Sequence, residues 1–285
     1  EFTLRILTTS FLLFIPAMLW RFEMHESLAA HSLVLAAFAI IFNNHSKWKN
    51  SFWIILIIIS ALIMPYFSMM VLTLWIASLL DRVFLKRELS FTKAIQTIII
   101  SFVALLLAMY LSGYFVIPLG SASVNDLGRF GDYPNNLYSF FNPNGWSYIW
   151  TGIPQIFINY EGFNYLGLGI ICLIPFSAYG LWESRNNFFK FIGNNVFLLI
   201  GILFLYLFSL SSNVHIGGNI YRIPTPDWAG KYLDIFRCSG RMAWPLLYLL
   251  VYTILVFAAK ALPYRNACII LFAFLMLQVV DTSAG

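Results

Sequence analysis

Two arginines four residues apart are the first candidates for chemistry in this chain. Arg237 and Arg241 follow a loop rich in glycine and proline and precede an uncharged apolar segment, residues 246–259. On a helix this spacing places both guanidinium groups on one face. Together with the free N–H groups at a helix start, they could hold a phosphate or pyrophosphate. The alternative is interfacial anchoring, in which the arginines reach lipid headgroups beside Trp244.

A second polar cluster precedes and enters the apolar run at residues 27–42. Glu23, His25 and Glu26 stand at its start, and His31 lies inside it. A polar side chain within an apolar segment usually faces protein or a cavity. Glutamate and histidine can ligate a divalent cation, but this spacing matches no metal motif. We therefore assign no metal ligands and favour a charged cap with a hydrogen-bonded core histidine, with ligation of a divalent cation as the alternative.

The third group of candidates lies in two long loops, residues 120–164 and 211–240. Aromatic side chains there alternate with carboxylates and amides, a composition that suits a sugar or lipid headgroup. Asp132 and Glu161 are the candidate bases, with Arg129, Tyr165 and His215 as further groove residues. An amphipathic belt lying on the bilayer is the alternative. The sequence contains no nucleophile elbow, phosphate-binding P-loop or dinucleotide fingerprint.

Composition identifies the environment in which these residues must work. The chain has 285 residues, of which 60% are hydrophobic and 10% charged, whereas soluble domains carry about 25% charged residues. The sequence therefore predicts an integral membrane protein. Its net charge of +5 comes from short loops between apolar runs and forms no basic stripe, which argues against nucleic-acid binding. The three cysteines have neither disulfide nor metal spacing.

The apolar runs predict an all-α, polytopic transmembrane bundle of about eight or nine membrane segments, forming a single transmembrane domain over residues 1–285. The run at residues 52–80 is longer than one crossing needs and is interrupted at Pro65. We expect a hairpin of two short helices there, with a single kinked helix as the alternative. The runs are residues 4–20, 27–42, 52–80, 94–119, 166–181, 196–210, 242–259 and 267–280.

Most lysines and arginines fall in the N-terminal segment and in residues 43–50, 81–93, 183–194 and 260–266. The positive-inside tendency makes these segments cytoplasmic. The N-terminal end of the chain is then cytoplasmic, and both long loops face the exterior together with the arginine pair. We expect a turn around Arg185 and Lys190.

Three stretches carry a resemblance to a known family. They are residues 28–31 within HESLAAHSLVLAAF, EGFNYLGLG at 161–169, and FRCSGRMAWP at 236–245. Together they resemble a family of bacterial polytopic membrane proteins of unestablished function, whose layout is similar to the C-type glycosyltransferase fold. The Pro65 hairpin fits that layout.

The resemblance implies a transferase in the bacterial inner membrane that takes a sugar from a polyprenyl-phosphate carrier at the periplasmic face, in cell-envelope glycan assembly. It implies that the principal catalytic acids lie in a first exterior loop, expected upstream of Glu1, and that an exterior domain follows Gly285. It leaves divalent-cation use open. Arg237 and Arg241 would bind the donor phosphate, and Asp132 or Glu161 would act as the base. The groove would be lined by His25, His31, Arg129, Tyr165, His215 and Trp244.

Two other classes of function stay open. A transporter or flippase would carry charge in the middle of its helices, and apart from His31 the apolar runs carry almost none. A non-catalytic component of envelope-polysaccharide assembly fits the same pattern of residues.

Overall fold

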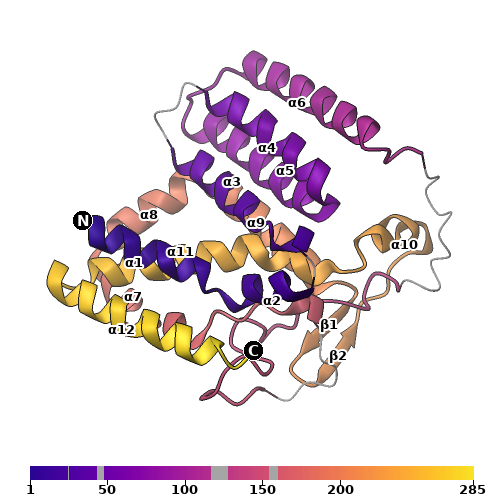
Figure 1. The fold of residues 1–285 in the computed structure, drawn as a ribbon. Coiled ribbons are helices and arrows are strands. Elements are labelled where there is room, and N and C mark those ends of the chain that lie inside the picture. The colour runs from indigo at the N-terminus through magenta and orange to yellow at the C-terminus, as the bar shows by residue number, and fades with distance from the viewer. Residues whose placement is uncertain (25, 44–47, 117–127, 154–159) are drawn as a thin grey trace.

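The structure is a computed structural model that describes residues 1–24, 26–43, 48–116, 128–153 and 160–285. The described part is mostly helical, as expected for an all-α membrane protein (Figure 1). Its elements are α1 (Phe2–Leu13), α2 (Pro16–Met24), η1 (Glu26–Ala29), α3 (Ser32–Phe42), α4 (Lys49–Ile63), α5 (Pro65–Leu80), η2 (Asp81–Leu85), α6 (Phe91–Leu111), η4 (Tyr160–Gly162), α7 (Leu168–Glu183), α8 (Arg185–Asn194), α9 (Val196–Leu210), β1 (Asn213–Ile216), β2 (Asn219–Arg222), α10 (Asp227–Leu233), η5 (Asp234–Phe236), η6 (Ser239–Ala243), α11 (Trp244–Lys260) and α12 (Tyr264–Thr282).

Several of these helices are long and apolar enough to cross a membrane. Among the described residues there are four such spans, or up to six if two bent helix pairs each count as one. This confirms a helical membrane protein, while eight or nine segments stay a prediction. The four spans are Pro65–Leu85, Phe91–Leu111, Ser239–Lys260 and Tyr264–Thr282. The bent pairs are Phe2–Leu13 with Pro16–Phe22, at 53°, and Arg185–Asn194 with Val196–Leu210, at 80°.

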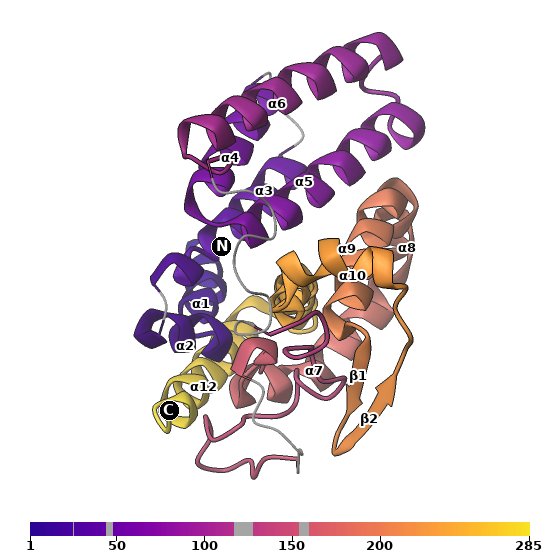
Figure 2. The same cartoon turned by 90° about the vertical axis from the view of Figure 1, so that its right-hand side faces the viewer.

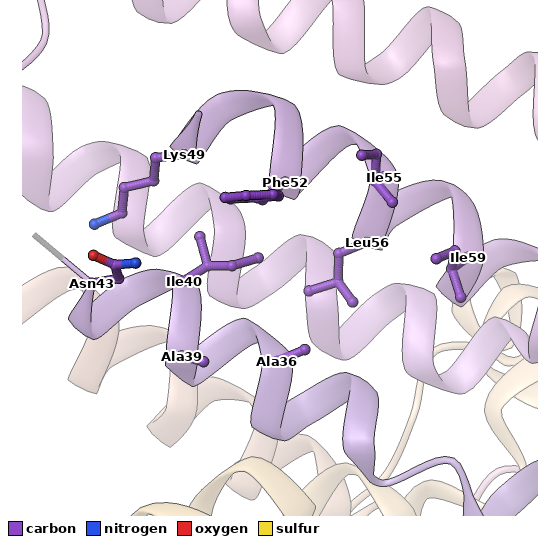
Figure 3. Close-up of a pocket in the computed structure, with 9 residues that line it drawn as sticks. All are labelled: Ala36, Ala39, Ile40, Asn43, Lys49, Phe52, Ile55, Leu56 and Ile59. Carbon is purple, nitrogen blue, oxygen red and sulfur yellow. The ribbon is translucent and has the colours of Figure 1, made fainter. Parts of the chain in front are cut away.

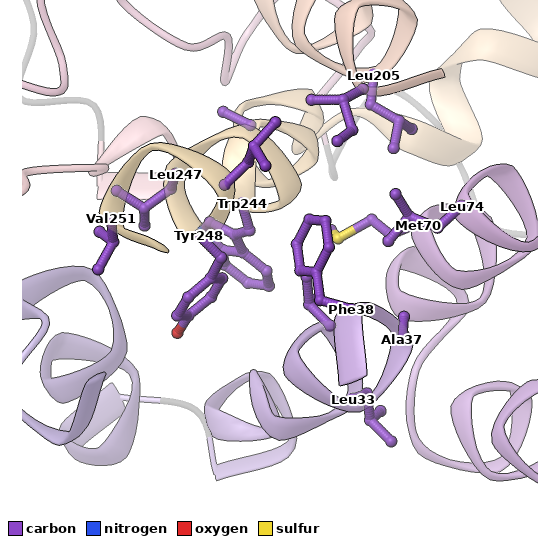
Figure 4. Packing of buried hydrophobic residues seen from close by; sticks show 14 of the residues in the cluster. Leu33, Ala37, Phe38, Met70, Leu74, Leu205, Trp244, Leu247, Tyr248 and Val251 are labelled. Carbon is purple, nitrogen blue, oxygen red and sulfur yellow. The ribbon is translucent and has the colours of Figure 1, made fainter. Parts of the chain in front are cut away.

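The helices form two layers joined at the middle of the molecule. In Figures 1 and 2, α4, α5 and α6 lie side by side in one layer, and α1, α7, α11 and α12 lie in the other. Between them α9 packs against both α5 and α11. Figure 4 shows the apolar contact where α3, α5, α9 and α11 meet, around Phe38, Met70, Leu205 and Trp244. Burial of this surface orders the helices that carry the polar residues described below.

The break at Pro65 produces a helical hairpin, as the sequence predicts. Met64 is extended, with φ −164° and ψ 132°, and Pro65 opens α5 where its missing N–H costs no helical hydrogen bond. Helices α4 and α5 pack against each other. Arg82, just beyond α5, donates to the Asn50 side chain at the start of α4 over 2.8 Å. The outer ends of the two helices are therefore adjacent, which excludes a single kinked helix. We call the end that carries Lys49, Arg82 and Lys86 the basic end.

The segment around Arg185 and Lys190 is a helix, so our expectation of a turn there is wrong. It forms α8, which meets α9 at 80°. The Asp81 carboxylate accepts hydrogen bonds from the Phe197 and Leu198 N–H groups at 2.9 and 3.1 Å. It thereby caps the first turn of α9 from a distant part of the chain. This cap allows α9 to start sharply after the bend.

The two long loops pack on one another at the opposite end, which we call the loop end. A short antiparallel hairpin, β1–β2, turns at Gly217 with φ +56°. It adds a strand pair that we did not predict, on the side of the molecule away from α6 (Figure 2). The Leu137 N–H donates to the His215 carbonyl at 2.9 Å, and Gly240 N–H donates to Tyr133 at 3.0 Å. The loops therefore share one face with the segment that contains Arg241, as expected.

Candidate functional site

Two buried arginines share one carboxylate at the loop end. Arg241, in η6, donates from Nε and Nη2 to the two carboxylate oxygens of Glu161 at 2.6 and 2.7 Å. Arg21, in α2, places Nη1 3.0 Å from Glu161 Oε2. The Arg21 side chain is 2% exposed, Arg241 6% and Glu161 14%. We call these three residues the Arg–Glu–Arg triad, and its formal charge is +1.

Close backbone packing brings Glu161 and Arg241 together. A Cβ atom on Gly240 would lie 2.7 Å from the Gly162 Cα, so position 240 requires glycine to let η4 and η6 touch. The buried Asn164 side chain donates to the Asn135 side chain at 3.1 Å and to the Gly162 carbonyl at 3.2 Å. The close approach explains why glycine precedes Arg241, and these hydrogen bonds explain the asparagine three residues after Glu161. The motifs at residues 161–169 and 236–245 therefore form the contact between the two loops.

Aromatic rings cover both guanidinium groups. The Arg241 guanidinium lies 4.7 Å from the centre of the Tyr66 ring, and that of Arg21 lies 5.7 Å from the Trp244 ring. The Tyr66 hydroxyl accepts a hydrogen bond from the Cys238 N–H at 3.1 Å. Cation–π contacts of this kind strengthen when water is excluded. The rings therefore compensate part of the cost of burying two positive charges.

A buried histidine extends this group into the core. The His31 ring lies 4.0 Å from the Trp244 ring, and its Nδ1 is 2.8 Å from the Tyr248 hydroxyl. Among the described residues, neither His31 Nε2 nor Trp244 Nε1 has a hydrogen-bond partner, although both atoms are buried. Unsatisfied buried polar atoms in folded proteins usually bind water or a ligand. His31 Nε2 and Trp244 Nε1 are two such atoms, and both belong to the aromatic group that covers Arg21.

The expected geometry of Arg237 and Arg241 is wrong. Arg237 precedes η6 and lies outside any helix, so the four-residue spacing does not place the two guanidinium groups on one helical face. Arg237 is half-buried, and its side chain has no ion-pair partner among the described residues. Arg241 is buried and pairs with Glu161. The two arginines therefore differ in availability: only Arg237 is free to meet an anion without displacing a carboxylate.

The remaining predicted site residues do not all gather at the triad. Asp132 is exposed, and its carboxylate accepts the Arg129 N–H at 2.6 Å, closing a local turn. Tyr165 is fully buried with Trp146 and Phe163, and burial raises the pKa of its hydroxyl. His215 belongs to β1, where partial burial lowers the pKa of its ring. His25 lies outside the described residues.

The structure thus brings together Glu161, Arg241, His31 and Trp244 from the predicted set. Sequence reasoning missed Arg21, Tyr66 and Tyr248 as members of the site. One signal for Arg21 was available, since it is a basic residue on the predicted exterior side, close in sequence to His31. No group of three or more histidine, cysteine or acidic side chains in the described ranges could hold a metal ion.

Comparison with known proteins identifies the family to which the chain belongs. No curated protein and no solved structure matches the chain. A family model described as a domain of unknown function, DUF6311, matches residues 1–283, which is nearly the whole chain. The chain therefore belongs to the DUF6311 family.

Proposed function

We propose that this protein is a membrane-embedded, glycosyltransferase-like protein that uses a polyprenyl-phosphate-linked sugar at the exterior face of a bacterial inner membrane. The observation that carries the proposal is the convergence of Arg21 and Arg241 on one carboxylate. Guanidinium groups bind carboxylate and phosphate with the same two-pronged geometry. Glu161 therefore occupies a position in which a phosphate would find two donors already oriented.

The chemistry would proceed by exchange at this position. The donor phosphate takes over the guanidinium donors of the arginines, and the released Glu161 carboxylate accepts the proton of an acceptor hydroxyl. The acceptor oxygen bonds to the anomeric carbon while the bond from that carbon to the phosphate oxygen breaks. The polyprenyl phosphate then leaves with its negative charge stabilised by the arginines. Arg237, half-buried on the same loop segment, would attract the incoming phosphate.

A second candidate is a non-catalytic component of envelope-polysaccharide assembly. The observation that favours it is the saturation of Glu161, whose two carboxylate oxygens both accept from Arg241 at 2.7 Å or less. In that case the triad would serve only to join the two loops, with no exchange of ligands.

The experiment uses the full-length protein in lipid nanodiscs with radiolabelled polyprenyl-phosphate sugars. Donor binding and release of the carrier lipid are measured for the wild type, for Arg241→Met and for Arg222→Met. Arg222 is an exposed arginine on β2 and serves as the control for loss of one positive charge. We expect Arg241→Met to lose both donor binding and release, with Arg222→Met unchanged. Equal donor binding by all three proteins would overturn the phosphate site, and binding without release would favour the non-catalytic candidate.

A further inference from the structure

An apolar groove runs along the surface between α3 and α4 at the basic end (Figure 3). Its volume is about 380 Å³, within the range of ligand-binding sites. The groove is open on the α3 side because Ala36 and Ala39 have short side chains (Figure 3). The α4 side is formed by Phe52, Ile55 and Ile59, which are 47%, 52% and 40% exposed. Such a surface suits a hydrocarbon chain.

The length of the groove matches one leaflet of a bilayer. Lys49 and Ile59 mark its two ends along α4, and ten residues of helix extend about 15 Å. The hydrocarbon core of a bilayer is about 30 Å thick, so the groove covers about half of it. One acyl chain of a lipid in that leaflet would lie along the groove with its headgroup beside Lys49.

Lys49 is a buried cation without a carboxylate partner among the described residues. It is 5% exposed, and the one hydrogen bond that the structure gives its ammonium group goes to the Ile41 carbonyl at 3.0 Å. An ammonium group has three donors, so two remain for another ligand. A buried charge is costly unless it is paired, which makes an anion the expected ligand. In Figure 3 the Lys49 nitrogen and the Asn43 side chain lie together at one end of the groove.

The surroundings of Lys49 also favour an anion. Arg82 and Lys86 lie close enough to act electrostatically on Lys49, and Glu88 is the one described acid that does so. Glu88 already pairs with Arg82 at 3.7 Å. Lys49 is also the first residue of α4, whose N-terminal N–H groups carry partial positive charge. The excess of positive charge at this end therefore complements a phosphate group.

From these features we infer that the α3–α4 groove binds an anionic phospholipid, with one acyl chain along Ala36, Ala39, Leu56 and Ile59 and the phosphate at Lys49. The inference does not depend on the proposed transferase activity, because the groove lies at the basic end and the triad at the loop end. A zwitterionic lipid fits less well, since its own ammonium group would meet the cluster of Lys49, Arg82 and Lys86.

Native mass spectrometry of the full-length protein tests this inference, with phosphatidylglycerol and phosphatidylcholine of identical acyl chains added in detergent. The wild type should retain phosphatidylglycerol more strongly. Lys49→Gln should lower that retention about fivefold, the factor expected for one lysine near an anionic lipid. Its control is Lys93→Gln, which removes an exposed lysine from the start of α6.

A second pair of variants tests the groove itself. Ala36→Phe fills the hollow and should lower retention of both lipids, whereas Ala273→Phe, on the exposed face of α12, should change neither. Equal retention of the two lipids by the wild type, or unchanged phosphatidylglycerol retention in Lys49→Gln, would overturn the inference. Lys49→Gln keeps the test decisive even if Ala36→Phe fails to fold.

Discussion

Buried positive charges have different partners at the two ends of the α4–α5 hairpin. At its tip, Tyr66 covers Arg241, which shares the Glu161 carboxylate with Arg21. At its open end, Lys49 is buried and, among the described residues, bonds only to a backbone carbonyl. At the loop end the buried arginines pair with a carboxylate of the protein, whereas at the basic end Lys49 can still bind an anionic ligand.

This difference separates two roles for positive charge in a membrane protein. In the Arg–Glu–Arg triad the partners are already in place, so a phosphate can enter only by displacing Glu161. At Lys49 an anion can be added without displacing any described side chain. Stability should therefore depend most on the triad, and lipid binding most on Lys49.

The largest expected effect comes from Glu161→Ala. Removing this carboxylate leaves two buried guanidinium groups unpaired, which we expect to cost about 3–5 kcal/mol in the free energy of unfolding. Arg241→Met should cost less, because Arg21 and Glu161 then remain as a neutral pair. Unfolding in detergent, followed by tryptophan fluorescence, measures both variants.

Chemical rescue of Glu161→Ala tests whether the two arginines can bind an added anion. If the two arginines form an anion site, added phosphate should raise the unfolding temperature of Glu161→Ala in a concentration-dependent way and leave the wild type unchanged. Rescue would show that a phosphate can replace Glu161. Equal stability of Glu161→Ala and the wild type would contradict the structural importance of the triad.

The next effect in size concerns the backbone contact that joins the two loops. Gly240→Ala introduces a Cβ atom 2.7 Å from the Gly162 Cα, and overpacking of this kind costs about 1–3 kcal/mol. The matched control is Gly193→Ala in α8, where an added Cβ meets nothing within 4 Å. That control should be neutral or slightly stabilising, because alanine favours a helix. Equal unfolding temperatures for the two variants would show that η4 and η6 do not depend on close contact.

The helical membrane class and the Pro65 hairpin could be predicted because both depend on local composition. The triad could not be assembled from one sequence, since Arg241 and Glu161 are 80 residues apart and Arg21 and Glu161 are 140 apart. Ion pairs at such separations leave no periodic pattern. Their convergence is fixed by tertiary contacts, such as that between Gly162 and Gly240.

Two errors had local signals that were misread. Gly217-Gly218 between NVHI and NIYR is typical of a hairpin turn, yet we did not predict the strands that flank it. The Arg237–Arg241 prediction assumed that the helix already included Arg237. The helical turn instead begins at Ser239, where Gly240 packs closely against Gly162.

The smallest expected effect comes from Asp81 at the basic end, whose buried carboxylate hydrogen-bonds to backbone N–H groups. Asp81 is 1% exposed and caps α9 through the Phe197 and Leu198 N–H groups. Asp81→Ala removes this cap and should cost about 1 kcal/mol, as for other helix caps. The control is Glu183→Ala, an exposed acid whose carboxylate accepts only from the Tyr179 hydroxyl among the described residues, and it should leave the unfolding temperature unchanged. A loss for Asp81→Ala as large as that for Glu161→Ala would mean that both ends rely equally on buried charge, which contradicts the difference between them.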